Sequence, residues 1–499
     1  MTELPVAGTL QSIDWAAISV PVTLAVGAVV VLLADAFLGP RRLAGTLTIV
    51  TAIVGAGFAL GLANDLQGAG SESSRATFCV PAGLERLTSC SYAVDSATIA
   101  VWTVTLLGVL VVALLMLGRD DLTPPGEFHF LMLCSASGAA TIAGARDLVT
   151  LVVALELVSL PAFAMVGLRR DNKPAAEAAL KFFLISVVST AVMLFGISLL
   201  YGITGSVYLD QIAVSLNESS VKAVVGVGVV LTLVGLGFKV AAVPFHVWVP
   251  DTYVGASVPV AAYLSVVSKA AGLVGLIQVL RYGLWPYADT WGPILAVVAA
   301  LTMTVGNVAA LRQRDPVRLL AWSSVAQAGY MLAPLAVLSG SSVLESRDAF
   351  VATLAYLLIY SIVNLSAFAV VSVVGGGRRD TLDSYAGLSR REPVAAAALA
   401  FALLCLAGLP PGVVGLFAKL VVFQAIVNSG TGWLALVMAA NVAIGLAYYL
   451  RWLVMVFWPS ADVEPTNLPN GAGVAITTTL TLAVVFSVWP AGILSILSA

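Results

Sequence analysis

Stretches of about 20 predominantly apolar residues follow one another along almost the whole chain, and a helix needs about this length to cross a bilayer. The composition agrees, because 60% of the 499 residues are hydrophobic and only 10% are charged, whereas a soluble domain carries roughly 25% charged residues. We therefore expect an all-α, polytopic membrane protein. The length rule predicts fourteen spans, at about 16–38, 43–63, 94–117, 127–145, 147–168, 174–201, 221–243, 256–281, 293–312, 317–339, 348–375, 394–429, 433–457 and 471–497.

The predicted loops are short, and the longest stretch outside the spans is about 64–93. No soluble domain fits between the spans, so residues 1–499 are expected to form a single transmembrane domain. Residues 1–15 contain no Lys or Arg, whereas a cleavable signal peptide begins with a basic region. The first span is therefore interpreted as a retained helix.

Basic residues in the loops predict the orientation, because cytoplasmic loops are enriched in Lys and Arg. With the N-terminus outside and the spans alternating, fourteen of the 24 basic residues fall in inner loops and six in outer loops. Both termini are therefore expected outside. The four basic residues that remain are lysines within predicted spans: Lys181, Lys239, Lys269 and Lys419.

Two spans contain prolines that interrupt a helix, Pro244 in the seventh and the pair Pro410 and Pro411 in the twelfth. Proline lacks an amide donor and clashes with the preceding turn, so such breaks in membranes lie inside protein or beside water. Broken helices at corresponding positions in two halves are typical of inverted-repeat transporters. We expect two inverted five-helix repeats at about 127–281 and 293–457, with residues 1–126 before them and the span 471–497 after them.

Charged side chains inside the bilayer are the candidate functional residues. Each costs at least ~2.5–3.5 kcal/mol, and such residues usually mark ion or proton pathways. Glu156 lies in the middle of an apolar segment, Lys239 five residues before Pro244, and Lys419 eight residues after Pro411. We interpret these charges, together with the mid-span lysine of the eighth segment, as a route for protons that starts at Glu156.

Two of these residues have structural alternatives that the sequence leaves open. Glu156 could be a protonated carboxyl hydrogen-bonded to a neighbouring helix, and Lys239 could form a permanent ion pair. Lys269 lies too deep to reach the interface easily, and Ser265 and Ser268 could hold water beside it.

Lys181 and His246 are more ambiguous. Lys181 lies only ~10 Å into its helix at 1.5 Å per residue, and Glu177 stands one turn earlier, so a local surface pair explains it about as well as a proton role. His246 follows the first break. It could pass protons between Lys239 and Lys269, because imidazole titrates near neutral pH, or its ring could simply hold the broken backbone.

No cofactor or metal site is predicted on this chain. The two histidines and four cysteines show no metal-ligand or iron–sulfur spacing, and no P-loop or dinucleotide-binding glycine motif occurs. The formal charge of −2 gives no indication of nucleic-acid binding. Cys79 and Cys90 share an outer loop, where an oxidising compartment would allow a disulfide, and both the bonded and the free state stay open.

Five motifs give the chain a resemblance to the antiporter-like subunits of respiratory complex I over nearly its whole length. They are LELVSLP at 155–161, EAALKFF at 177–183, GFKVAAVPFHVWVPD at 237–251, RDPVRLLAWSS at 314–324 and AGLPPG at 407–412. Lys419 and the chain length favour the N-type branch of that family. One departure, at 255–259, where the family usually has an Ala-Pro pair, concerns only the turn before the eighth span.

The resemblance implies fourteen helices, two inverted repeats and a polar axis along the membrane plane. By motif it carries the family's charged positions onto Glu156, Lys181, Lys239, Lys269 and Lys419. It also implies a bacterial plasma membrane, contacts with lipids and with the neighbouring K and M subunits, and a complex whose NADH, FMN, iron–sulfur clusters and quinone are bound by other subunits.

The expected function is therefore proton translocation as a subunit of complex I, driven by electron transfer elsewhere in the complex. An Mrp-type cation/proton antiporter subunit is the first alternative, and sodium-dependent transport by the isolated chain would favour it. A purely structural subunit is the second, and neutral effects of mutating all four mid-membrane charges would support it.

Overall fold

The structure is a computed structural model that describes residues 13–38, 41–69, 74–80, 89–117, 125–169, 172–338, 343–374, 381–459 and 469–493. Both chain ends, on which the predicted orientation bears, and the C-terminal part of the fourteenth span lie outside these residues. The first half comprises α1 (Ser19–Leu38), α2 (Arg41–Ala69), β1 (Arg75–Cys79), β2 (Cys90–Val94), α3 (Ser96–Met116), α4 (Pro125–Gly144), α5 (Leu148–Gly167), α6 (Lys173–Thr204), α7 (Leu209–Glu218), α8 (Lys222–Val240) and α9 (Trp248–Gly255).

The eighth span is continuous but not uniformly α-helical. It consists of α10 (Val258–Tyr263), the π-helical turn η1 (Leu264–Ser268), α11 (Lys269–Gln278) and a second π-helical turn, η2 (Val279–Gly283). The rest of the chain forms η3 (Trp285–Tyr287), α12 (Ala288–Leu311), α13 (Pro316–Ala336), α14 (Val343–Val374), η4 (Leu382–Tyr385), α15 (Leu388–Arg391), α16 (Pro393–Ala407), α17 (Val413–Asn428), α18 (Gly432–Phe457) and α19 (Asn470–Val488).

The prediction of a polytopic helical membrane protein is confirmed. Within the described ranges, eleven helices are long and apolar enough to cross a membrane. Two further helices, α4 and α13, have 20 and 21 residues, and the shorter apolar helices α16 and α17 together fill the twelfth predicted span. Each of the fourteen predicted spans therefore has a helical counterpart.

Several helices begin where a polar residue satisfies the free backbone N–H groups of the first turn. The side chain of Asp147 accepts from Thr150 N at 2.8 Å ahead of α5, and Asp315 accepts from Arg318 N at 2.9 Å ahead of α13. In α13 a proline follows the cap directly, a position where its missing N–H costs nothing. Apolar stretches and caps together explain why sequence alone locates these helices.

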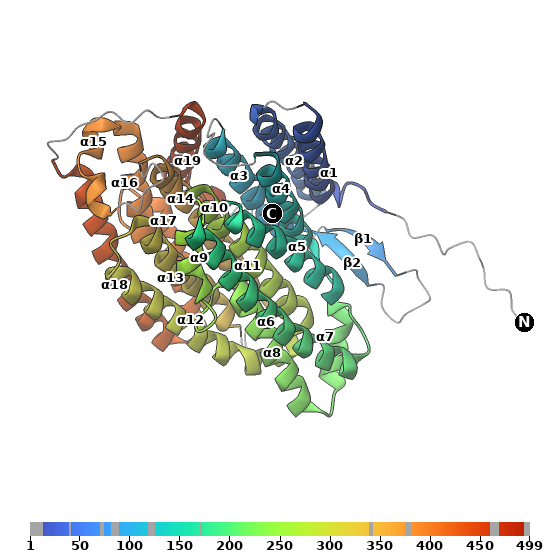
Figure 1. The fold of residues 1–499 in the computed structure, drawn as a ribbon. Coiled ribbons are helices and arrows are strands. Elements are labelled where there is room, and N and C mark those ends of the chain that lie inside the picture. Colours follow the sequence, from blue (N-terminus) through green and yellow to red (C-terminus); the bar gives the residue numbers. More distant parts are fainter. Residues whose placement is uncertain are drawn as a thin grey trace, which may run out of the picture.

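The sequence did not predict the elements outside the spans. The helix α7 has only 10 residues and buries three of them, Leu209, Ile212 and Leu216. The strands β1 and β2 pair antiparallel in a hairpin that lies beside α5 in Figure 1. Both elements are shorter than the apolar stretches on which the prediction relied.

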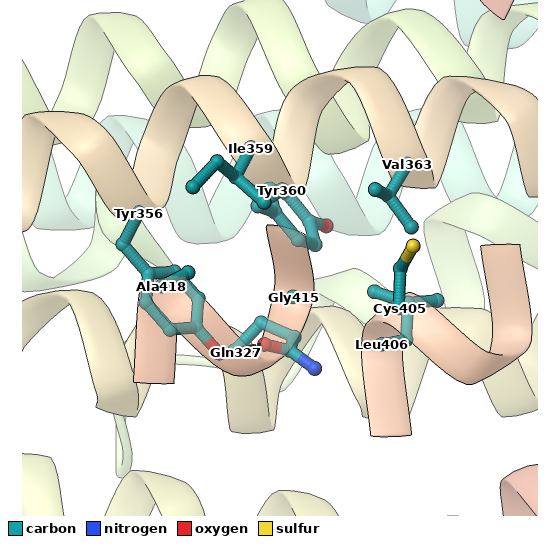
Figure 2. Close-up of a pocket in the computed structure, with 9 residues that line it drawn as sticks. All are labelled: Gln327, Tyr356, Ile359, Tyr360, Val363, Cys405, Leu406, Gly415 and Ala418. Carbon is teal, nitrogen blue, oxygen red and sulfur yellow. Dashed lines mark hydrogen bonds between the residues drawn. The ribbon is translucent and has the colours of Figure 1, made fainter. Parts of the chain in front are cut away.

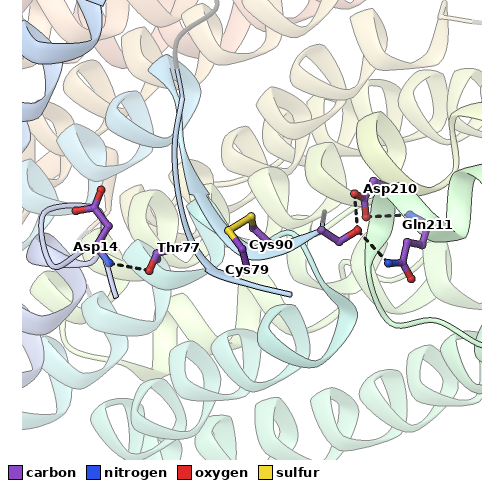
Figure 3. Close-up of a disulfide and its surroundings, with 7 residues drawn as sticks. Asp14, Thr77, Cys79, Cys90, Asp210 and Gln211 are labelled. Carbon is purple, nitrogen blue, oxygen red and sulfur yellow. Dashed lines mark hydrogen bonds between the residues drawn. A yellow bond between two sulfur atoms is a disulfide. The ribbon is translucent and has the colours of Figure 1, made fainter. Parts of the chain in front are cut away.

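A disulfide between Cys79 and Cys90 closes this hairpin (Figure 3). The backbone N–H of Asp14, just ahead of α1, donates to the hydroxyl of Thr77 in β1 at 3.0 Å. On the other side, Ser89 Oγ donates to the carboxylate of Asp210 in α7 at 2.8 Å. The hairpin thus ties the start of α1 to the connection between α6 and α8.

The eighth span lies in the middle of the molecule. In Figure 1 its helices α10 and α11 lie between the blue first helices and the orange α15–α17. The helix α10 contacts α3 and α14, and α11 contacts α4 and α8. Almost all of this span is buried within the protein, whereas only about a third of the residues of α1, α6 and α19 are buried. Lys269, in the middle of the span, therefore lies away from lipid.

Candidate functional site

Glu156 on α5 and Lys239 near the end of α8 form an ion pair within the membrane region. Lys239 Nζ lies 3.4 Å from Glu156 Oε1 and also donates to Ser159 Oγ at 2.8 Å and Ser186 Oγ at 3.1 Å. Glu156 Oε1 accepts a further hydrogen bond from Thr190 Oγ1 at 2.8 Å. Two helices, α5 and α6, thus supply partners for the ammonium group that α8 carries.

The two members of this pair differ in exposure. The side chain of Lys239 is 8% exposed and that of Glu156 is 29% exposed. Around Glu156, the α5 residues Val149, Val153 and Leu160 are all more than half exposed. An ionised carboxylate facing lipid would be unfavourable by several kcal/mol, so this face of α5 is unusual for a surface covered by lipid alone.

The first helix break follows directly after Lys239. The helix α8 ends at Val240, and Ala241 takes a left-handed conformation with φ of 67°. The indole N–H of Trp248 donates to the Phe238 carbonyl at 3.1 Å. The N–H of Val243 donates to the hydroxyl of Thr302 on α12 at 2.9 Å. Protein side chains therefore satisfy the exposed backbone groups, as a break inside a membrane requires.

His246 lies in this break, partly buried, and its ring packs against Trp322 with 5.4 Å between the ring centroids. Among the hydrogen bonds of the described residues, none joins His246 to Lys239 or to Lys269. The geometry therefore matches the packing interpretation of His246 directly, and a proton role would need intervening water.

Lys269 stands at the start of α11, immediately after the π-helical turn η1, and is 3% exposed. It donates to both the backbone carbonyl and the hydroxyl of Ser324 on α13. The hydroxyl of Tyr360 on α14 donates to the same Ser324 Oγ at 2.8 Å. No described carboxylate pairs with Lys269, so neutral dipoles alone surround this ammonium.

The sequence drew attention to Ser265 and Ser268 as residues that could hold water beside Lys269, and this stays a prediction. Ser265 Oγ donates to the Ala262 carbonyl at 2.8 Å and accepts from Asn364 Nδ2 at 2.7 Å. The direct partner of Lys269, Ser324 on α13, was not predicted. Its signal in the sequence is a helical spacing of polar residues, with Ser324 three residues before Gln327.

Close backbone contact brings Lys269 and Lys239 to neighbouring helices. A Cβ atom at Gly272, one turn after Lys269, would lie 2.7 Å from the carbonyl oxygen of Lys239. Only glycine allows this approach of α11 to the end of α8.

Lys419 lies in α17, after the second break, and is 7% exposed. Its Nζ donates to the carbonyls of Leu406 and Ala407 at 2.7 Å each. These carbonyls belong to the last turn of α16, where a helix leaves C=O groups unpaired and carries a partial negative charge. Lys419 thus fills the break itself. Gly408 makes room for it, since a Cβ there would lie 3.2 Å from Lys419 Nζ.

A small cavity lies between the partners of Lys269 and those of Lys419 (Figure 2). It has about 10 Å³ of room for the centre of a water molecule, roughly the least volume that holds one water. Residues of α13, α14, α16 and α17 line it: Gln327, Tyr356, Ile359, Tyr360, Val363, Cys405, Leu406, Gly415 and Ala418.

A dense buried network of neutral polar side chains lies beside this cavity, and the sequence interpretation did not include it. Tyr356 OH donates to Gln327 Oε1 at 2.5 Å, and Gln327 Nε2 donates to Tyr449 OH at 3.1 Å. Asn307 accepts from Tyr448 OH at 2.9 Å. Satisfied buried networks of this kind stiffen a protein interior.

Lys181 does not join the other lysines. Its Nζ lies 2.7 Å from Glu177 and 3.7 Å from Asp251, and Asp251 also lies 3.6 Å from Arg318. The side chain of Lys181 is half exposed. This arrangement is the local surface pair that the i,i+4 spacing indicates. Within the described chain, no cluster of three His, Cys, Asp or Glu side chains could hold a metal ion.

Comparisons with known proteins agree over nearly the whole chain. Residues 145–445 match the family described as NADH:quinone oxidoreductase/Mrp antiporter, TM. NADH-quinone oxidoreductase subunit N 2 of Streptomyces griseus is 51% identical over 480 residues, which are 94% of this chain and 86% of that protein.

Two solved structures share the fold. A chain of Thermus thermophilus respiratory complex I with bound aureothin is 30% identical with a TM-score of 0.75, and the match covers 95% of this chain and 98% of that one. A chain of the Dietzia sp. Mrp complex is 20% identical with a TM-score of 0.83, covering 96% of both chains. The second likeness concerns the fold alone.

Proposed function

Since the chain belongs to the NADH:quinone oxidoreductase/Mrp antiporter transmembrane family and groups with its subunits N, we propose that it translocates protons as a membrane subunit of bacterial respiratory complex I. Protons would move along Glu156, Lys239, Lys269 and Lys419. NADH oxidation and quinone reduction, with their FMN and iron–sulfur clusters, would take place on other subunits.

The observation that carries this proposal is the ion pair of buried Lys239 with Glu156, together with two further buried lysines. Lys239 has a carboxylate at 3.4 Å, whereas the described partners of Lys269 and Lys419 are hydroxyl and carbonyl acceptors. Three ammonium groups buried within the membrane region cost several kcal/mol each, and a purely structural helix bundle has no need of them.

The pair is strong enough to drive a proton step. At 3.4 Å and an effective dielectric constant of about 20, the attraction is about 5 kcal/mol. Moving one charge against 100 mV costs ~2.3 kcal/mol. Neutralising or withdrawing Glu156 would therefore release enough free energy to send a proton from Lys239 towards Lys269.

The exposed face of α5 supports a partner at Glu156. This carboxylate, 29% exposed, stands among apolar residues that face outward, so a neighbouring membrane subunit would shield it and pass on the charge change. We assign this role to the K-side neighbour, with an M-type subunit on the other side of the chain and lipids elsewhere. We further propose that the chain lies in the plasma membrane with both termini outside.

We propose the two inverted repeats at about 127–281 and 293–457. What supports them is that each range contains one span broken at proline, the fourth of five in both. The broken span carries a buried lysine in each, Lys239 and Lys419.

The decisive test is Lys239→Ala in the assembled complex, with proton pumping and quinone reduction measured in membrane vesicles. We expect pumping to be lost. The matched control is Lys222→Ala, since this exposed lysine begins the same helix α8 and should be silent. Full pumping with normal quinone reduction in Lys239→Ala would reject the assigned role.

The Mrp-type antiporter is the second candidate, and the shared fold is the observation in its favour. Membrane vesicles that contain only this chain separate the two. Sodium-dependent proton movement would favour the antiporter, and its absence would favour a complex I subunit.

A further inference from the structure

Among the described hydrogen bonds, none joins Lys269 directly to Lys419, the last step of the proposed route. Lys269 is bound to Ser324 on α13, and Lys419 is bound to the end of α16. The cavity of Figure 2 lies between these two clusters, because Tyr360, which donates to Ser324, and Leu406, which accepts from Lys419, both line it.

The polar groups around the cavity are unequal in what they can still bind. The hydroxyl of Tyr356 and the amide of Gln327 bind each other and Tyr449. The Tyr360 hydroxyl uses its proton on Ser324 and keeps acceptor capacity on its oxygen, and the Leu406 carbonyl has a second lone pair beyond the one used by Lys419. Tyr360 and Leu406 are therefore the two groups able to hold a water.

We propose that one water occupies this cavity and that Tyr360 and Ser324, with that water, complete the hydrogen-bonded link from Lys269 to Lys419. This inference rests on the proposed function, because it concerns protons that move between these lysines. It assigns a relay role to two residues, and a water site to a cavity, that the lysine route by itself does not include.

The transfer balances. With the Ser324 and Tyr360 hydroxyls turned towards the cavity, the Lys269 ammonium gives a proton to Ser324 Oγ, Ser324 gives its own proton to the Tyr360 oxygen, and Tyr360 gives its proton to the water. The water, held at the Leu406 carbonyl to which Lys419 is also bound, then protonates the neutral Lys419 amine. Lys269 ends neutral and Lys419 charged, and both hydroxyls end neutral with their protons moved to the other side. Hydroxyl hydrogens rotate freely enough to reset.

The closing experiment compares two tyrosines that line the same cavity. In Tyr360→Phe the relay hydroxyl is lost, whereas in Tyr356→Phe the hydroxyl lost is one already bound to Gln327. Protons translocated per electron are measured in vesicles with the assembled complex, because this ratio does not depend on how much complex assembles. We expect the proton-transfer step through this chain to slow by about 100-fold in Tyr360→Phe, the lower range for a positioned proton donor, so that the ratio falls in this variant and persists in Tyr356→Phe.

Further variants separate the possible failures. Val363→Ile adds a methylene to the cavity wall and leaves every hydroxyl in place, so it should displace the water and lower the ratio too. This variant decides the matter if Tyr360→Phe does not assemble. Normal ratios in Tyr360→Phe or Val363→Ile, while Lys269→Ala and Lys419→Ala lose pumping, overturn the link and leave the lysine route intact. Normal pumping in both lysine variants overturns the proposed function itself.

Discussion

Replacing Glu156 by glutamine tests the electrostatic drive without removing a hydrogen-bond acceptor. The amide oxygen of glutamine can still accept from Thr190 Oγ1, now at 2.8 Å, and from Lys239. What is lost is the attraction of about 5 kcal/mol between opposite charges at 3.4 Å. This loss exceeds the ~2.3 kcal/mol needed to move a charge against 100 mV, so loading a proton onto Lys239 becomes uphill in the variant, and the change of charge that would send it onward is absent.

An uncompensated barrier of ~2.3 kcal/mol corresponds to about a 50-fold slower step. The assay is proton pumping by vesicles at a set membrane potential, with electron transfer to an artificial acceptor as the measure of assembled complex. Glu177→Gln is the matched control, because it removes a carboxylate of the exposed Lys181 pair and should leave pumping unchanged. Unaltered pumping in Glu156→Gln, with a fully assembled complex, would refute the argument that this ion pair drives the proton.

Three further outcomes follow from single contacts. Gly408→Ala forces a residue with a Cβ atom into a left-handed conformation with φ of 81° and places that atom 3.2 Å from Lys419 Nζ. The free energy of unfolding, measured by thermal unfolding, should fall by at least ~1–2 kcal/mol. Gly432→Ala is the control, because a Cβ atom there meets open space and should leave the stability near that of the parent chain. Alkylation of the denatured, unreduced protein should label two of the four cysteines, and reduction should destabilise it by about 3 kcal/mol from loop entropy; four labelled thiols before reduction would contradict the Cys79–Cys90 bond. Ahead of α3, burial acts to raise the pKa of Asp95, but Arg146 at 3.0 Å and the Thr98 hydrogen bonds hold it below its usual range. The stabilisation that the Asp95 carboxylate contributes is thus complete above about pH 4 and is lost as pH falls through the lower folded pKa. Asp95→Asn keeps the helix cap and should remove this contribution to the fall of the melting temperature at acid pH.

The spans were predictable because each obeys a simple rule of length and apolarity. The two breaks were predicted from proline, which disfavours a helix but does not always end one, since Pro161 and Pro334 lie inside the continuous helices α5 and α13. The charged residues stood out for a similar reason, since a charge such as that of Lys269 or Glu156 is unfavourable in the hydrocarbon core unless protein surrounds it. The partners did not stand out. Ser324 and Tyr360 are ordinary residue types in helices, and nothing local to either one indicates that α13 and α14 meet at Lys269.

Backbone geometry was also beyond the sequence. The π-helical turn ahead of Lys269 has no proline or glycine to mark it, and the hairpin depends on a disulfide between cysteines eleven residues apart whose pairing the sequence left open. For His246 the sequence left a relay and a packing role open. The structure adds the contact of its ring with Trp322, and the relay stays a prediction.

The two broken helices solve one physical problem in different ways, and the difference bears on the direction of charge movement. At the first break, Trp248 and an α12 threonine satisfy the freed backbone, so Lys239 is left to pair with Glu156. At the second, Lys419 itself satisfies the freed carbonyls of α16. A charge on Lys239 is therefore stabilised by a full opposite charge, and a charge on Lys419 by helix-end dipoles, worth at most ~2 kcal/mol in partly buried sites. Protons should rest on Lys239 while Glu156 is ionised, and should move towards Lys269 and Lys419 only when that carboxylate loses its charge.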